Sequence, residues 1–268
     1  MSSDPVPTEP VQSDPVSSQP VRDEPAPEWD PGDLTGLDIS AQAFIRTVDA
    51  LTPEELEGPS LLPGWTRAHV VAHVALNGFA LAGVLDGLVH DQPVAMYESD
   101  EQRDSQIEEL AEAEPSELRE QHLAATTAFA DAVEALRDEH WSGHIDRLPG
   151  GPAWPAVTVV PTRRREVEVH HADLGTSYTR ADWPRDFVAE LLNTVVVDHA
   201  ASGPFQLRAT DLGRDWSVGG DSGPTVMGAG ADLGWWLTGR SEGEGLSSDA
   251  GELPSLGPWR RAAAGQQP

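Results

Sequence analysis

The sequence predicts a mainly helical protein, in which a bundle of four helices is followed by a small α+β domain. Between residues 37 and 175, apolar residues recur at helical spacing in four separate segments. After Trp183, one helix is followed by short alternating segments, a pattern typical of strands. A proline-rich stretch precedes both parts. We therefore expect a tail over residues 1–33, a bundle over 34–182 and the small domain over 183–268.

The tail is a degenerate array in which a proline recurs at every fifth position from Pro5 to Pro25, usually after an acidic residue. Proline at this density excludes helices and sheet ladders, and the few valines cannot offset the entropy cost of ordering the backbone. We expect a disordered, partly extended segment that increases solubility. A ligand for a polyproline-binding partner is the alternative.

Capping residues mark the first two bundle helices. The first helix is predicted over residues 37–51 from its apolar spacing. Thr52, followed by Pro53, has the form of a capping box that opens a further short turn of helix. Thr66 is a good N-cap for a second long helix that begins at the next residue.

The third and fourth helices follow a polar connection. The segment 93–103 is mostly polar and fits a surface linker. The third helix is predicted from Ser116, as its cap, to about Asp138. A Gly/Pro-rich loop leads into the fourth helix, for which Gly175 is a good C-terminal cap.

The remaining chain predicts a small α+β domain. A helix over residues 184–200 comes first, and a second, apolar helix over 231–240 follows the strands. Three short segments between these helices have strand character: 204–209, 216–218 and 225–227. Helices and strands that follow one another in this way indicate an α+β unit.

Composition excludes several classes of function. The chain has 17 basic and 45 acidic residues and a net charge of −28, which repels nucleic acids and anionic membranes. It contains no lysine, so lysine Schiff-base chemistry is excluded. It also contains no cysteine, which excludes disulfides, thiolate metal ligands and a protein thiol nucleophile. Any sulfur chemistry needs a thiol from outside.

The most hydrophobic stretch, residues 70–89, is interrupted by His73, Asn77 and Asp86. Polar residues at these positions favour a buried bundle helix over a membrane span. The acidic, proline-rich N-terminus is unlike a signal peptide. We therefore expect a cytoplasmic protein without membrane or nucleic-acid partners, and the sequence is compatible with a monomer.

Two segments contain potential metal ligands. Glu166 and His170 lie four residues apart in the fourth helix, so both project from one face, and Asp173 lies close to the same stripe. A catalytic zinc usually takes three protein ligands, and His73 in the second helix is the best source of the third. The alternative is that His73 is an ordinary core residue and that Glu166 and His170 form a solvated surface pair.

Considered together, these segments resemble the mycothiol-dependent maleylpyruvate isomerase family. The resemblance is carried by residues 64–75, Gly-Trp-Thr-Arg-Ala-His-Val-Val-Ala-His-Val-Ala, and by the run from Arg165 to Gly175. It extends through residues 93–103 and 231–240 and covers nearly everything except the tail.

The resemblance implies a DinB-like four-helix bundle with a metal site, usually zinc, and a small C-terminal α/β domain. It implies His73, Glu166 and His170 as the metal ligands, with His69 as the rival of His73. It also implies Arg103 and Arg240 as active-site arginines, although Arg240 could equally be a cation that stabilises a helix C-terminus. Two residues depart from the family pattern, Glu168 and His171, at positions where similar proteins often look more apolar.

The function that the resemblance implies is the conversion of maleylpyruvate to fumarylpyruvate, with a divalent metal and mycothiol as cofactors. Arg240 is expected to bind the enolate or a carboxylate, and Arg103 the substrate or the thiol cofactor. Asp173 could support a ligating imidazole by accepting its other N–H. One alternative is a mycothiol S-transferase that acts on another electrophile, and another is a non-catalytic bundle that binds metal.

Overall fold

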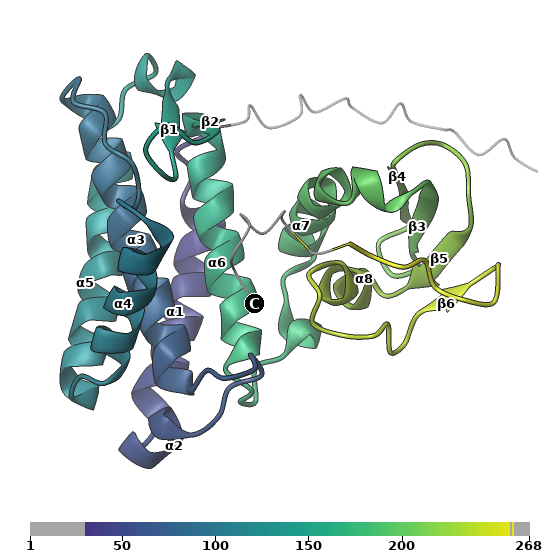
Figure 1. The fold of residues 1–268 in the computed structure, drawn as a ribbon, viewed down its shortest axis with the longest axis horizontal. Helices are drawn as coiled ribbons and strands as arrows, with labels where there is room; N and C mark the ends of the chain where they lie inside the picture. Colours follow the sequence, from purple (N-terminus) through teal and green to yellow (C-terminus); the bar gives the residue numbers. More distant parts are fainter. Residues whose placement is uncertain (1–29, 258, 260–268) are drawn as a thin grey trace, which may run out of the picture. The chain divides into compact units, whose positions relative to one another are not determined.

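The computed structural model describes residues 30–257 and residue 259 (Figure 1). The predicted tail over 1–33 therefore lies almost entirely outside the described residues. Helices make up most of the first part of the chain: α1 (Thr35–Ala50), α2 (Pro53–Glu57), α3 (Arg67–Val89), α4 (Asp100–Ala111), α5 (Pro115–Glu134) and α6 (Val159–Asp173). A small antiparallel hairpin of β1 (His144–Asp146) and β2 (Ala153–Pro155) lies between α5 and α6.

The four predicted bundle helices correspond to α1, α3, α5 and α6. Helix α3 packs against α5 and α6, and α1 packs against α5 and α6. Their apolar faces enclose one hydrophobic core, which includes Phe44, Val71, Leu81, Phe129 and Val167. The mainly helical fold and the bundle are as predicted.

The caps of α2 and α3 are also as predicted. Thr52 forms a capping box with Glu55, and Thr66 forms one with His69. Among the described residues, α3 is the one helix long and apolar enough to cross a membrane by length and composition. In the structure 61% of its apolar window is buried inside the protein, because α3 packs against α4, α5 and α6.

Two details between α3 and α6 differ from the prediction. The segment 93–103 is not a plain linker, because Ser99 caps a helix, α4, that starts at Asp100. This helix has a single buried residue, Ile107, so it lacks the apolar periodicity by which helices are predicted. Helix α5 begins one residue earlier than expected, with Pro115 at its first position, and Ser116 is not its cap.

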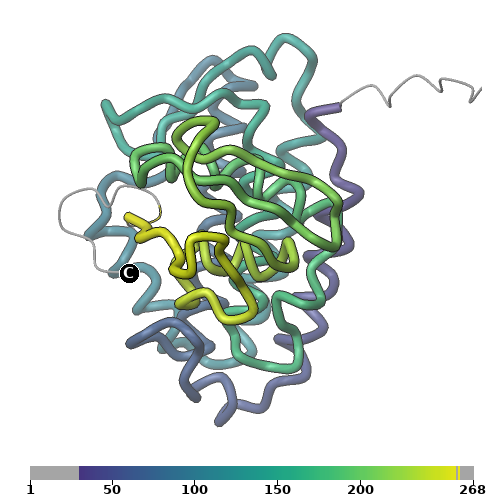
Figure 2. Tube along the Cα trace, turned by 90° about the vertical axis from the view of Figure 1, so that its right-hand side faces the viewer, coloured from purple at the N-terminus to yellow at the C-terminus, as the bar shows by residue number. Residues whose placement is uncertain are grey.

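The second part of the chain is the predicted α+β unit. It contains α7 (Arg185–Asp198), β3 (Phe205–Ala209), β4 (Arg214–Val218), β5 (Thr225–Gly228), α8 (Gly230–Leu237) and the short β6 (Ser247–Ser248). The sheet has the order β4-β3-β5-β6, with β3 and β5 parallel and the outer pairs antiparallel. It can be followed in green and yellow in Figure 2.

Helix α6 contributes to both hydrophobic cores of the described chain. Val167 belongs to the core of the bundle, whereas Val169 and Ala172 belong to the core that includes Phe187 and Trp236. The indole N–H of Trp183 also donates to the Glu168 carbonyl oxygen over 3.0 Å. Since α6 also contains two of the predicted ligands, residues from both parts of the chain can reach the same site.

Candidate metal centre

Three side chains predicted from the sequence meet between α3 and α6. His73 Nε2 lies 3.2 Å from Glu166 Oε2, and His170 Nε2 lies 3.4 Å from the same oxygen. The potential ligand atoms of all three residues lie within 4.8 Å of one another. The three side chains are 10–13% exposed, so the cluster is largely shielded from water without being closed.

Local sequence positions these groups. The spacing of four residues places Glu166 and His170 on one face of α6, as expected. One turn earlier, the guanidinium of Arg163 donates to the Val74 carbonyl oxygen and to Asn77 Oδ1, and so ties α6 to α3. Gly78 leaves the space for this contact, because a Cβ there would lie 2.9 Å from Arg163 Nη2. These two hydrogen bonds fix the segment of α3 that contains His73 against α6.

The donor set and its spacing fit a divalent metal such as zinc. Zinc bonds of about 2.0–2.1 Å in a tetrahedral arrangement place neighbouring ligand atoms about 3.4 Å apart. The two separations from Glu166 Oε2, 3.2 and 3.4 Å, agree with this value. Two imidazoles and one carboxylate are also a common protein ligand set for a catalytic zinc.

The surroundings of His73 and Glu166 favour the protonation states in which these two side chains bind a metal. Burial lowers the pKa of His73, and it prevails over the hydrogen bond and the charge of Glu166, which act to raise this pKa. Burial opposes ionisation of Glu166, but its hydrogen bonds with His170 and His73 outweigh burial and hold its pKa well below the usual value. A neutral imidazole and an ionised carboxylate are the forms that bind a metal.

Asp173 contacts His170 at Nδ1, the ring nitrogen that does not face Glu166. His170 Nδ1 lies 2.9 Å from Asp173 Oδ2, and the two groups form an ion pair when the imidazole is protonated. Burial acts against the imidazolium, but the interactions with Asp173 and Glu166 prevail and raise the pKa of His170. The Asp173 charge favours a proton on Nδ1, so in the neutral imidazole Nε2 is the nitrogen available to bind a metal.

Arg240 is paired with Asp173. Its Nε and Nη2 donate to the two carboxylate oxygens over 2.8–3.1 Å, and its Nη1 donates to the Thr238 carbonyl oxygen. The guanidinium also lies 5.8 Å from the ring centre of Trp235 and 5.4 Å from that of Trp259. A residue of the second domain is thereby connected to the cluster through Asp173 and His170.

Arg103 approaches the cluster from α4. Its charge acts on the pKa values of both His73 and Tyr97. Its Nη2 forms an ion pair with Asp104 over 2.7 Å, and 20% of its side chain is exposed. Arg103 thus lies close enough to act electrostatically on the cluster and remains accessible from solvent.

Sequence reasoning missed Tyr97. The residue is 8% exposed, and burial together with the negative charge of Glu166 raises its pKa to about 12. The phenol therefore keeps its proton and is a neutral hydrogen-bond donor beside the cluster. Tyr97 lies in the segment 93–103, which is part of the family resemblance, and this position was the signal by which the residue could have been found.

The rival histidine of α3 has a different role. His69 Nδ1 lies 2.7 Å from Thr66 Oγ1 in the capping box, and His69 Nε2 lies 3.1 Å from Glu108 of α4. It is not part of the cluster of potential ligands. Glu168 and His171 are likewise outside this cluster, and their hydrogen bonds go to α1 and to Tyr178.

Comparisons with known proteins agree with this architecture. Residues 37–175 match the family described as "Mycothiol maleylpyruvate isomerase N-terminal domain", and residues 182–258 match its C-terminal domain. The sequence matches no curated protein.

Two solved structures are similar to the chain: a mycothiol-dependent maleylpyruvate isomerase and a histidine-to-alanine mutant of it. Each shares 26% sequence identity with a TM-score of 0.76, over 84% of this chain and 95% of the other. Because the first family model covers more than half of the sequence and the second covers most of the remainder, the chain belongs to the mycothiol-dependent maleylpyruvate isomerase family.

Proposed function

We propose that His73, Glu166 and His170 bind a divalent metal, best fitted by zinc, and that the protein isomerises maleylpyruvate to fumarylpyruvate with mycothiol as the thiol. The observation that carries the proposal is the cluster itself, whose 3.2 and 3.4 Å separations suit a tetrahedral ion. Membership of the family supports the choice of thiol and substrate. The absence of cysteine from the sequence is consistent with a borrowed thiol.

The reaction needs a thiolate nucleophile, residues that bind the substrate and groups that stabilise an enolate. When bound, the metal lowers the pKa of a coordinated thiol, so that thiolate is available near neutral pH. Addition of the thiolate to the cis double bond converts it to a single bond and forms an enolate. After rotation about that bond, expulsion of the thiolate re-forms the double bond in the trans geometry. The thiol is regenerated, so no other reactant is consumed.

The two arginines are suited to different tasks. Arg103 has one partly exposed partner, Asp104, so its planar guanidinium can turn to a substrate carboxylate. Arg240 gives Nε and one N–H of Nη2 to Asp173 and one N–H of Nη1 to Thr238, so one N–H remains on each terminal nitrogen. We assign Arg103 to the substrate, and Arg240 to the stabilisation of developing negative charge and to the orientation of His170 through Asp173.

Metal analysis of two matched variants tests the ligand assignment. His73→Ala should lose the bound metal and reduce mycothiol-dependent turnover to background, because two ligands do not retain the ion. His69→Ala removes the same side chain one turn earlier on the same helix and should keep metal and turnover. Metal content is measured by mass spectrometry on the purified protein, beside a maleylpyruvate assay with and without mycothiol. A stoichiometric metal in His73→Ala contradicts the assignment.

The same assay separates the alternative functions. Isomerisation leaves the mycothiol concentration unchanged, whereas a mycothiol S-transferase consumes one thiol for each conjugate formed. A protein that binds metal stoichiometrically but shows no thiol-dependent reaction with maleylpyruvate or other electrophiles would instead be a metal-binding bundle without catalytic function. We propose a cytoplasmic location, where small thiols are kept reduced.

A further inference from the structure

The guanidinium of Arg240, which we assign to the stabilisation of negative charge, lies over the ring of Trp259. The guanidinium carbon is 5.4 Å from the centre of this ring. The match to the C-terminal family model ends at residue 258, so the model does not cover Trp259. Membership of the family therefore assigns no role to this residue.

The described residues after β6 bring Trp259 to this position without a further helix or strand, and they can be followed in yellow in Figure 1. The Trp259 ring packs against the hydrophobic core that includes Phe187. Its Nε1 donates to Asp198 Oδ2 over 3.0 Å, and the Gly257 N–H donates to Ser202 Oγ over 3.2 Å. Both acceptors lie at or just after the C-terminal end of α7, so the ring is fixed to the second domain.

The contacts of Arg240 show what the ring contributes. Hydrogen bonds to the Asp173 carboxylate and to the Thr238 carbonyl oxygen fix the edge of the guanidinium. The rings of Trp235 and Trp259 lie at 5.8 and 5.4 Å, within the range in which an aromatic face attracts a cation. Because the Arg240 side chain is only 12% exposed, water competes little with this attraction. The two rings thus limit the tilt of the guanidinium, which the hydrogen bonds at its edge leave free.

Trp259 also contacts α6 itself. The guanidinium carbon of Arg165, the residue before the candidate ligand Glu166, lies 6.0 Å from the centre of the same ring. Among the described residues, the buried Nε of Arg165 has no hydrogen-bond partner. One ring therefore lies against a residue of α6 and against Arg240 after α8, the two elements that contribute Glu166 and the charge-stabilising arginine.

We propose that Trp259 is a positioning residue for the isomerisation, because its ring orients the Arg240 guanidinium toward the developing enolate. The proposal deepens the proposed function and rests on it. Trp259 forms no bond with the substrate. Without the ring, Arg240 keeps its partner Asp173 but stabilises the developing charge less well, since such stabilisation depends on orientation fixed in advance. The loss should therefore fall on kcat, whereas KM depends on Arg103, which we assign to the substrate.

Two substitutions of Trp259 test the role of the ring in catalysis. Trp259→Leu keeps apolar bulk but removes the aromatic face, and should lower kcat about tenfold with KM changed by less than about threefold. Tenfold corresponds to about 1.4 kcal/mol, which is within the range of a shielded cation–π contact. Trp259→Phe keeps an aromatic face and should restore kcat to at least about a third of its original value.

A second readout does not require turnover. In protein labelled with ¹⁵N-arginine, NMR measures how fast the Arg240 Nε–H exchanges with water, and the signal is identified by its loss in Arg240→Lys. Exchange should be at least about threefold faster in Trp259→Leu, because a less restrained guanidinium opens its hydrogen bonds more often. Metal content should stay unchanged, since Trp259 is not one of the candidate ligands.

Trp216→Leu is the matched control. The Trp216 ring packs against the same core, lies 5.0 Å from the Arg214 guanidinium carbon, and donates from Nε1 to Asn193 of α7 over 2.8 Å. It thus makes the same kinds of contact as Trp259, but with an arginine that has no assigned role. Trp216→Leu should keep kcat and the exchange rate of Arg240. Melting temperatures show which variants are folded in the assay, and Trp216→Phe takes the place of a leucine variant that is not.

The proposal is overturned if the Arg240 Nε–H exchanges at its original rate in Trp259→Leu, or if this variant keeps full kcat. It is equally overturned if the Trp216 control lowers kcat as much, since the loss would then follow from any disturbance of the second core. If the unmodified protein does not isomerise maleylpyruvate, the proposed function itself fails. The exchange rate still decides in that case whether Trp259 restrains Arg240.

Discussion

At the scale of single residues, the candidate site depends on charges that hold one another in place. The Asp173 carboxylate is 0% exposed and lies between the Arg240 guanidinium and the His170 imidazole. Burial disfavours its charge, but Arg240 and His170 outweigh burial and lower the pKa of Asp173. Such a carboxylate orients an imidazole and raises its basicity as a ligand.

Asp173→Asn should therefore reduce metal affinity by about 10- to 100-fold, because the amide keeps the shape of the side chain but loses its charge. Competition with a chelator of known affinity measures this change. Asp215→Asn is the matched control, since Asp215 pairs in the same bidentate manner with Arg208 on the exposed β3–β4 hairpin. Equal metal affinity in the two variants would show that Asp173 does not support His170.

A second residue-scale prediction concerns His122 in the core of the bundle. Its side chain is 2% exposed, its Nε2 has no hydrogen-bond partner, and its ring packs against Phe44. Burial, with a smaller effect of the Arg163 charge, lowers its pKa to about 3. Since the unfolded chain takes up the proton near pH 6.5, the folded state loses stability as the pH falls from there toward 3.

Between pH 7 and pH 5 this residue should cost about 2 kcal/mol of unfolding free energy, because each pKa unit is worth about 1.4 kcal/mol. His122→Leu should remove this part of the pH dependence, measured by urea unfolding at both pH values. His144→Leu, at an exposed position of β1, controls for the loss of an imidazole as such. The prediction is wrong if the His122 variant shows the same slope as the unmodified protein.

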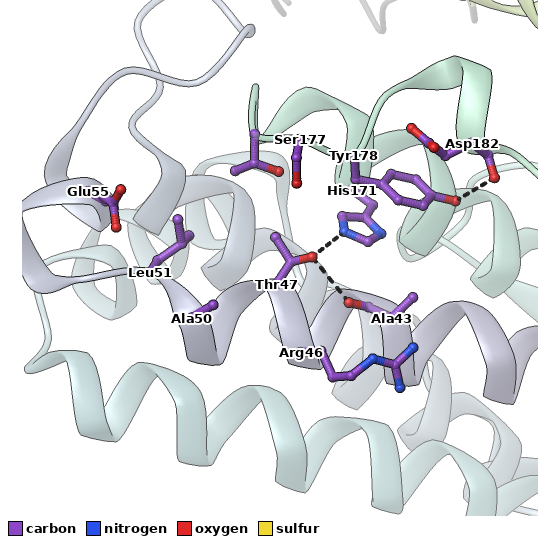
Figure 3. A pocket seen from close by; sticks show the side chains of 11 residues that line it. Ala43, Arg46, Thr47, Ala50, Leu51, Glu55, His171, Ser177, Tyr178 and Asp182 are labelled. Carbon is purple, nitrogen blue, oxygen red and sulfur yellow. Dashed lines mark hydrogen bonds between the residues drawn. The ribbon is translucent and has the colours of Figure 1, made fainter.

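At the scale of elements, α6 uses successive residues to contact different partners. Arg163 is directed to α3, and Arg164 forms an ion pair with Asp186 of α7. Glu166 and His170 belong to the candidate metal centre, while His171 lines a cavity that contains none of the three candidate ligands (Figure 3). Few residues of α6 remain for an apolar stripe, which explains why this helix is polar in sequence and yet largely buried.

The start of α3 is the second element on which the site depends. Thr66 Oγ1 accepts the backbone N–H of His69 and also lies 2.7 Å from its Nδ1. Thr66→Ala should lower the free energy of unfolding by about 1 kcal/mol, the usual cost of losing an N-cap, without loss of metal. Urea unfolding together with metal analysis checks both parts.

Thr127→Ala is the control for this substitution. Thr127 is an exposed threonine within α5, and its hydroxyl bonds to the Leu123 carbonyl of its own helix. It should change stability by less than about 0.5 kcal/mol. An equal loss in the two variants would argue against the capping role of Thr66.

At the scale of the whole molecule, charge and architecture have separate effects. The chain has a net charge of −28, so its like charges repel one another, and salt screens such repulsion beyond about 10 Å at 0.1 M. The family fold brings Asp173 of α6 and Arg240 after α8 together despite this excess of acidic residues. Added salt therefore weakens the local ion pairs, which lowers stability, and screens the repulsion between like charges, which raises stability.

Because 45 acidic residues outnumber 17 basic residues, screening of repulsion should prevail, and added salt should raise the melting temperature. Thermal unfolding in low salt and in about 0.15 M NaCl measures this, at an ionic strength where the Debye length is about 8 Å. Tetramethylammonium chloride at the same ionic strength separates screening from specific sodium binding. A melting temperature that falls with both salts would mean that ion pairs dominate.

The sequence by itself determined the features that depend on neighbours within about one helical turn. These are the N-caps Thr52 and Thr66, the end of α6 before Gly175, and the placement of Glu166 and His170 on one face of α6. Helix α4 was missed because its one buried residue, Ile107, gives no periodic pattern. The residue types of the cluster, and the absence of cysteine, were also readable without a structure.

Tertiary structure decided which distant groups meet. His73 and Glu166 are 93 residues apart in the sequence, and the packing of α3 on α6 brings these two together while His69 remains in its capping box. The burial of Tyr97, the pairing of Arg240 with Asp173 and the cavity between His171 and Arg46 are likewise products of packing. Local spacing fixes the direction of a side chain from its own helix, but the partner that it meets depends on how the helices pack.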